Sequence, residues 1–150
     1  MKLGLFLALF AAGALAQDKP ALRIVVDGVV KEAAACGLGV PAIEAVATRT
    51  LKSHNIAVSK NPADPYLYLN VNAYRVMQGA DVVGCTTRIG VSVRGAAGEG
   101  TVRGFKPKAD AYVVVCEAGR LLSGAQRDIV AAVTRAFEQD IKSCLSQLSY

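Results

Sequence analysis

The stretch that decides the fold is Tyr66-Leu67-Tyr68-Leu69-Asn70-Val71-Asn72-Ala73-Tyr74, in which apolar residues alternate with Tyr and Asn. Alternation with a period of two is typical of a β-strand that has one buried face and one exposed face. The odd-numbered side chains of this strand are therefore expected to pack against helices. The even-numbered side chains then face solvent, so we expect a sheet with one wet side.

The even-numbered row is also the first candidate binding surface. Tyr and Asn provide a large contact area and adaptable hydrogen bonds, which suits recognition. The same residue types are common on the wet face of a strand without any binding role. We predict that the surface consists of Tyr66, Tyr68, Asn70, Asn72 and Tyr74.

The segments around this strand predict a β-α-β-β-β-α order in one α+β domain, residues 17–150. Further strands are expected at Leu22–Val26, Val82–Val93 and Ala111–Cys116, the last extending as far as Ala118. Periodic apolar residues predict one helix at Pro41–Ser53 and a second helix of about 25 residues that begins near Ser123. This order predicts a two-layer sandwich, in which a four-stranded mixed sheet carries both helices on one face. The first two strands should be parallel, and the last three should form an antiparallel meander.

Short motifs refine the helix ends. Asn55 suits the left-handed conformation that ends the first helix. Ser123-Gly124-Ala125-Gln126 matches a capping box for the second helix. Val29–Gly39 remains ambiguous, with a single helical turn at Lys31–Ala35 as one interpretation.

The N-terminus has the three-part layout of a secretory signal peptide. Met1-Lys2 is basic, residues 3–15 are apolar, and Ala14-Leu15-Ala16 supplies small residues around a cleavage site. The apolar run is shorter than the roughly 20 residues of a membrane span, so residues 1–16 are expected to be removed. We therefore expect a periplasmic or secreted bacterial protein without a membrane span after cleavage.

Charge permits an anionic partner but does not require one. The full sequence has 17 basic and 12 acidic residues. Removing Lys2 with the signal peptide leaves 16 basic residues and a net charge of +4. An envelope protein or an anionic polymer would suit this mild excess, which is also typical of ordinary solubilising charge. We do not expect a nucleic-acid partner, because the sequence has no clustered Arg and aromatic surface.

Four cysteines in an oxidising compartment predict two disulfides. The expected topology places Cys36 and Cys85 at the same end of the sheet, which favours their pairing. Cys116 and Cys144 then pair by exclusion, although a Cys85–Cys116 bridge is a geometric rival. Buried free thiols also remain open for Cys116 and Cys144.

A glycine-rich basic connection runs from Gly95 to Lys108. It lacks the lysine and the following helix of a phosphate-binding loop, so a hairpin tip is the better interpretation. Arg94, Arg103, Lys106 and Lys108 make it a second candidate surface for an anionic partner, which Arg75 and Arg88 would extend. The alternative is a solvated loop.

Catalytic signals are weak. The single histidine, His54, falls in the last turn of a helix, where capping explains it better than a nucleophilic device does. Asp27 and Asp81 could form a carboxylate pair, although nothing in the sequence selects them. We assign no catalytic residue, and we expect no metal and no cofactor.

Four segments together resemble a group of small, uncharacterised, exported bacterial proteins. They are Ile24–Asp27, Ala35–Leu38, Ser53–Val58 and Asp64–Asn72. The resemblance is clearest at Cys36-Gly37-Leu38 and in the alternating strand, and it weakens from Gly95 onward. It implies the two-layer fold and a site of action outside the cytoplasm, and it implies no activity.

These observations favour a non-catalytic periplasmic binding or envelope-assembly module. Two alternatives remain at this point. One is a small secreted enzyme with a dispersed active site, and the other is a thiol-based redox protein.

Overall fold

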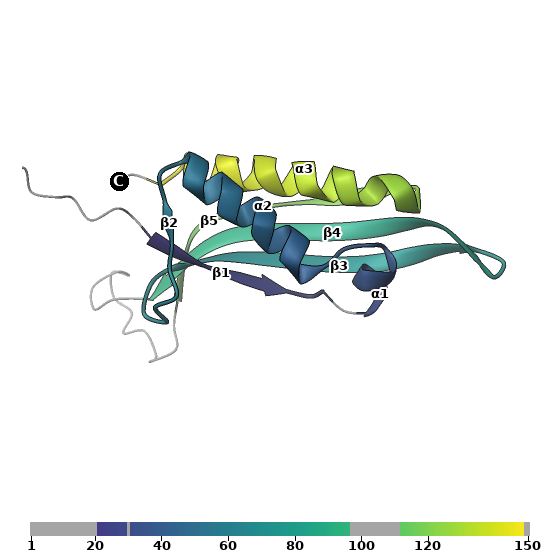
Figure 1. The fold of residues 1–150 in the computed structure, drawn as a ribbon, viewed down its shortest axis with the longest axis horizontal. Coiled ribbons are helices and arrows are strands. Elements are labelled where there is room, and N and C mark those ends of the chain that lie inside the picture. Colours follow the sequence, from purple (N-terminus) through teal and green to yellow (C-terminus); the bar gives the residue numbers. More distant parts are fainter. Residues whose placement is uncertain (1–20, 30, 97–111, 149–150) are drawn as a thin grey trace, which may run out of the picture.

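A computed structural model describes residues 21–29, 31–96 and 112–148. The expectations for the signal peptide (1–16) and for most of the glycine-rich connection lie outside these residues. Within them the chain forms β1 (Ala21–Asp27), α1 (Lys31–Ala35), α2 (Val40–Ser53), β2 (Ala57–Val58), β3 (Tyr66–Gln78), β4 (Asp81–Ala96), β5 (Tyr112–Gly124) and α3 (Gln126–Leu145). The strands form one sheet in the order β2-β1-β3-β4-β5 (Figure 1).

The expected strand directions are confirmed. β1 pairs with β3 in parallel, and β3, β4 and β5 pair as an antiparallel meander. The sheet is therefore mixed, and the fold is α+β.

The expected numbers of strands and helices were wrong, because the described residues contain five strands and three helices rather than four and two. The additional strand, β2, has only two residues, which pair with Ala21 and Leu22. An element this short shows no period in the sequence. The additional helix, α1, is a single turn that is followed by Gly37 at a φ of +80°.

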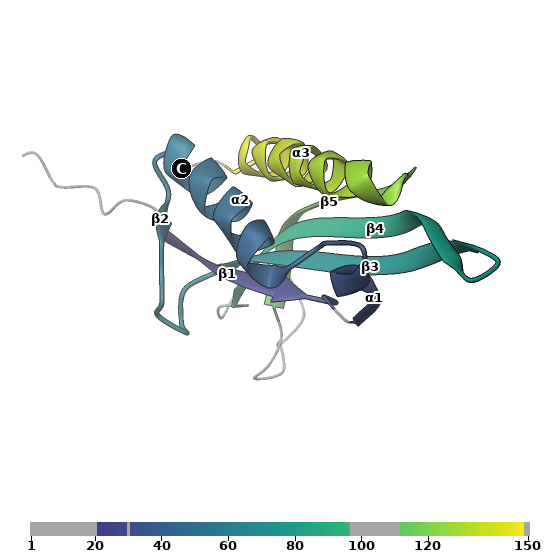
Figure 2. The same cartoon turned by 45° about the vertical axis from the view of Figure 1, so that its right-hand side comes forward.

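Two layers enclose the core. α2 and α3 lie side by side over one face of the sheet, and the β3–β4 hairpin extends beyond the first turn of α3 (Figures 1 and 2). The odd-numbered residues of β3 from Leu67 to Ala73 are buried, as the alternation predicts. Phe137 and Ile141 of α3 and Leu51 of α2 are at most 1% exposed, so the helices contribute large side chains to this core.

Asn55 ends α2 with a φ of 58°, which confirms the expected left-handed residue. The capping box was wrong. Ser123 belongs to β5, where its hydroxyl lies 3.1 Å from that of Thr86, and α3 begins at Gln126 without a side-chain cap. Pairing between β4 and β5 continues past the predicted strand, which reached Ala118 at most, as far as Gly124 opposite Cys85, and it overrides the short capping motif. As a result α3 has 20 residues, fewer than expected.

Two disulfides join the helical layer to the sheet. Cys36, which follows α1, is bonded to Cys85 of β4, and Cys116 of β5 is bonded to Cys144 of α3. These are the pairs that the sequence favoured. All four cysteines are at most 4% exposed, so both bonds are inside the core.

Replacing either cysteine pair by alanine should lower the free energy of unfolding by about 3–4 kcal/mol, because each bond restricts the unfolded chain. The Cys36–Cys85 bond closes 49 residues and the Cys116–Cys144 bond closes 28, so the first should have the larger effect. Urea unfolding of the two double variants measures both values. An unchanged midpoint in a double variant would show that its bond does not stabilise the native fold.

Thr87 provides a second stability test. It lies on the helix-facing side of β4 with 0% exposure, and its hydroxyl has no hydrogen-bond partner among the described residues. Thr87→Val keeps the shape and removes this unsatisfied group, so it should raise the free energy of unfolding by about 1 kcal/mol. Thr86→Val is the matched control, since the Thr86 hydroxyl has a partner on the opposite face. A loss of stability in Thr87→Val would mean that the hydroxyl is satisfied in solution.

In the part of the chain that the structure describes, no helix combines the length and the apolar character needed to cross a membrane.

Candidate functional site

The candidate site lies on the face of the sheet opposite α2 and α3. No described helix covers this face along β3, β4 and β5 (Figure 2). Its side chains come from alternate positions of each strand, because successive residues of a strand point to opposite faces. Strand register then sets which of them are neighbours.

Two glycines form the floor of the site. Gly90 of β4 pairs with Asn70 of β3 on one side and with Gly119 of β5 on the other. Two adjacent positions on the open face therefore have no side chain. A methyl group added at Gly119 would lie 2.9 Å from the carbonyl oxygen of Ile89, whereas one at Gly90 would lie 3.8 Å from Asn70, an ordinary contact. The backbone thus requires glycine at 119 and does not require it at 90.

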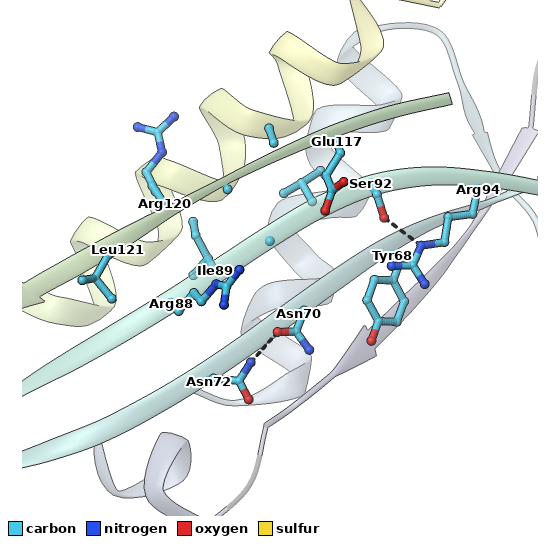
Figure 3. Close-up of a pocket in the computed structure, with 14 residues that line it drawn as sticks. Tyr68, Asn70, Asn72, Arg88, Ile89, Ser92, Arg94, Glu117, Arg120 and Leu121 are labelled. Carbon is cyan, nitrogen blue, oxygen red and sulfur yellow. Dashed lines mark hydrogen bonds between the residues drawn. The ribbon is translucent and has the colours of Figure 1, made fainter. Parts of the chain in front are cut away.

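Side chains around this floor enclose an open groove of about 870 Å³. Its lining comes from three strands (Figure 3). The residues are Tyr68, Asn70 and Asn72 of β3, Arg88, Ile89, Gly90, Val91, Ser92 and Arg94 of β4, and Glu117, Ala118, Gly119, Arg120 and Leu121 of β5. Ile89 and Val91 are 1% exposed and belong to the core, so they contribute mainly backbone to the groove.

One end of the groove is a polar cluster around Tyr68. The Arg94 guanidinium lies 3.9 Å from the centre of the Tyr68 ring, and Arg94 Nε donates a 2.9 Å hydrogen bond to the Ser92 hydroxyl. The Tyr68 hydroxyl donates a 2.6 Å hydrogen bond to Asp27 Oδ2. Glu117 pairs with Ser92 across the strands and completes this end.

The Tyr68–Asp27 hydrogen bond shifts both pKa values. It is the main cause that lowers the pKa of the Asp27 carboxyl, with help from the Gly28 amide, which also donates to this carboxylate. The same bond is the main cause that raises the pKa of the Tyr68 hydroxyl. The pair therefore favours a carboxylate beside a neutral phenol.

The other end of the groove is built on Arg88. Its strand neighbours are Asn72 on one side and Leu121 on the other. Asn72 Nδ2 donates a 2.5 Å hydrogen bond to Asn70 Oδ1, which aligns the two amides along the wall (Figure 3). Arg88 itself makes no hydrogen bond or ion pair with the described residues.

Five of the candidate residues line the groove together, namely Tyr68, Asn70, Asn72, Arg88 and Arg94. Tyr66 lies outside it, with the Arg23 guanidinium 5.2 Å from its ring centre. Tyr74 is also outside, farther along the hairpin and 67% exposed. The remaining candidates, Arg103, Lys106 and Lys108, lie outside the described residues.

Sequence reasoning missed the contribution of β5. Glu117, Gly119 and Leu121 alternate on the open face, but the predicted strand reached Ala118 at most and so left out Gly119 and Leu121. Both faces of this segment mix polar and apolar residues, so the sequence after Cys116 has no period of two to signal the strand. Arg120, which points toward α3 and pairs with the buried Asp140, marks the other face of the same strand (Figure 3).

The weaker catalytic candidates are dispersed. His54 Nδ1 lies 3.0 Å from the carbonyl oxygen of Thr50 at the end of α2, a capping position. The Asp27 carboxylate accepts a hydrogen bond from the Tyr68 hydroxyl. Asp81 lies at the turn of the β3–β4 hairpin, opposite Gln78, so the two aspartates do not form a pair. The groove brings together one carboxylate, that of Glu117, and no histidine among the described residues.

No protein-family model matches the chain, and no curated protein matches it in sequence. Three solved structures give partial likenesses. Rare lipoprotein B from Shewanella oneidensis is 11% identical, with 84% of this chain and 91% of that chain covered and a TM-score of 0.41. A neuraminyllactose-binding hemagglutinin homolog from Helicobacter pylori is 10% identical, with coverages of 88% and 84% and a TM-score of 0.40. A minor lipoprotein from Acinetobacter baumannii is 11% identical, with coverages of 81% and 94% and a TM-score of 0.33. Likenesses of this size transfer no function to the chain.

Tyr68→Phe should raise the pKa of Asp27 toward its ordinary value, because the variant loses the hydrogen bond that mainly lowers it. The lowered pKa means that Asp27 stabilises the fold above its unfolded-state pKa, and that this contribution is lost as pH falls through the folded-state value. Wild type should therefore lose more stability on acidification than Tyr68→Phe. Carboxyl NMR titration and acid unfolding measure the two effects.

Tyr74→Phe is the control for this prediction, because the Tyr74 hydroxyl has no partner among the described residues and the side chain is exposed. Identical Asp27 titration in Tyr68→Phe and wild type would contradict the role assigned to this hydrogen bond.

Proposed function

We propose that this protein is a non-catalytic binding module of the bacterial cell envelope and that the groove on the open face of its sheet is the binding surface. The ligand lies across β3, β4 and β5, over Gly90 and Gly119. The strands, which the core and both disulfides hold in place, present the recognition side chains in a fixed arrangement.

Gly90 is the observation that carries this proposal. Glycine inside a strand weakens the sheet, and it often marks a place where another molecule approaches closely. The fold itself would accept a side chain at this position, since the nearest atom to an added methyl group is 3.8 Å away. A need for open space above the sheet accounts for glycine here. The groove volume also falls within the range of about 300–1,000 Å³ that is typical of ligand sites.

The lining favours binding over catalysis. General acid–base chemistry needs positioned proton donors and acceptors, and the described residues place no second carboxylate and no histidine beside Glu117 in the groove. A thiol-based redox role is also disfavoured, because reactive cysteines are accessible and all four here are buried in disulfides.

A location outside the cytoplasm rests on two supports. The first is the signal peptide expected at residues 1–16. The second is the presence of two disulfides, which persist in oxidising compartments such as the periplasm. Both support a periplasmic or secreted protein.

Gly90→Val tests the groove by filling it. Valine suits a strand, and the available space should let the variant fold. We expect it to retain about ten-fold less of its partner from an envelope extract of the exporting cells, which corresponds to a loss of about 1.4 kcal/mol. Affinity capture followed by protein and polysaccharide analysis measures the retained material.

Gly124→Val is the matched control, because an added methyl group there meets open space at the end of β5, away from the groove. It should retain as much as wild type. Equal recovery of every component by wild type and by Gly90→Val would remove the groove as the binding surface.

A further inference from the structure

We infer that the ligand of the groove is an anionic oligosaccharide whose acidic group pairs with Arg88. This inference rests on the proposed binding function and adds the class of ligand and its direction in the groove. Three observations support it, namely the charge of Arg88, the distance between Arg88 and Glu117, and the polar lining of the groove.

Arg88 supplies the site for the acidic group. Its guanidinium forms no hydrogen bond or ion pair with the described residues, although it borders the groove beside Asn72 (Figure 3). A guanidinium presents a planar fork of donors that matches a carboxylate or a phosphate with two parallel hydrogen bonds. An acidic group of the ligand gives Arg88 the partner that the described residues do not provide.

Glu117 sets the direction of the ligand. It lies beside Ser92, four residues from Arg88 along β4, which is about 13 Å at the usual rise of a strand. A carboxylate there repels a second anion and accepts hydrogen bonds from hydroxyl groups. Arg94 lies at the same end, where its guanidinium already stacks on the Tyr68 ring and donates to the Ser92 hydroxyl. The acidic end of the ligand is therefore at Arg88, and a hydroxyl-bearing part lies near Glu117.

The lining favours a sugar over a peptide. Leu121 is the only large apolar side chain among the described residues that faces the groove, since Ile89 and Val91 point into the core. Peptide partners gain most of their affinity from apolar or aromatic anchors that fill pockets. The amides of Asn70 and Asn72 provide donors and acceptors for hydroxyl groups, and the glycine floor allows a ring to lie close to the sheet.

The test uses three probes of similar length, measured by calorimetry on the full mature chain. They are maltotetraonic acid, which carries a single carboxylate at one end, neutral maltotetraose and a tetra-aspartate peptide. Wild type should bind the acidic tetrasaccharide about ten-fold more tightly than the neutral one, because a hydrogen bond between ions is stronger than one between neutral groups. Added salt should reduce this difference.

Two arginine variants isolate the contact. Arg88→Gln should lose about ten-fold in affinity for the acidic tetrasaccharide and bind both tetrasaccharides equally. Arg75→Gln is the control, because Arg75 is exposed and pairs with Cys85, which places it on the opposite face of the sheet. This variant loses the same charge, and it should bind the acidic tetrasaccharide as tightly as wild type does. Unfolding midpoints equal to that of wild type show that both variants are folded.

Each contrary outcome has a distinct meaning. Equal binding of the two tetrasaccharides by wild type, or an unchanged Arg88→Gln, overturns the acidic contact while groove binding stands. Binding of the peptide alone overturns the sugar class and leaves the proposed function intact. Failure of all three probes also overturns the inference. Tetrasaccharide binding that Gly90→Val does not weaken overturns both the inference and the groove as the binding surface.

Discussion

The structure depends on the antiparallel register between β3 and β4. This ladder runs from Tyr66 opposite Arg94 to Gln78 opposite Asp81, and it places every odd-numbered residue from Leu67 to Ala73 under the helices. A shift of one residue would expose that apolar row and bury the Tyr and Asn row. The same register places Asn70 beside Gly90, so the core and the groove come from one set of pairings.

Both disulfides lie on the helix-facing side of the sheet, opposite the groove. One bond holds the segment after α1 against β4, and the other holds α3 against β5. Both therefore fasten the helical layer to the strands that form the groove. Neither disulfide lies on the open face, and among the described residues the support for that face is the buried face behind it.

Most of the fold could be predicted from local patterns. The alternation in β3, the apolar stripe of α2 and Asn55 at its end each have a local physical cause. The end of β5 could not be predicted, because Ser123 and Gln126 match a capping motif while cross-strand pairing determines the actual structure. The site was predictable only in part for the same reason. Tyr68 and Asn70 follow from the alternation within one strand. The position of Gly119 beside Gly90 depends instead on the register between two strands that are 15 residues apart in the sequence.

The glycine floor has a mechanical consequence for the sheet. Cross-strand side-chain contacts stabilise neighbouring strands, and the row at Gly90 and Gly119 lacks them on the open face. This row therefore lacks a stabilising contact that neighbouring rows of the β4–β5 ladder have, and its amide protons should exchange with solvent more readily than theirs. A ligand that touches Arg88 at one end and Glu117 at the other would bridge β4 and β5 across this row. A bound ligand would then stiffen the sheet, so the melting temperature of the protein would rise with the fraction of grooves that hold a ligand.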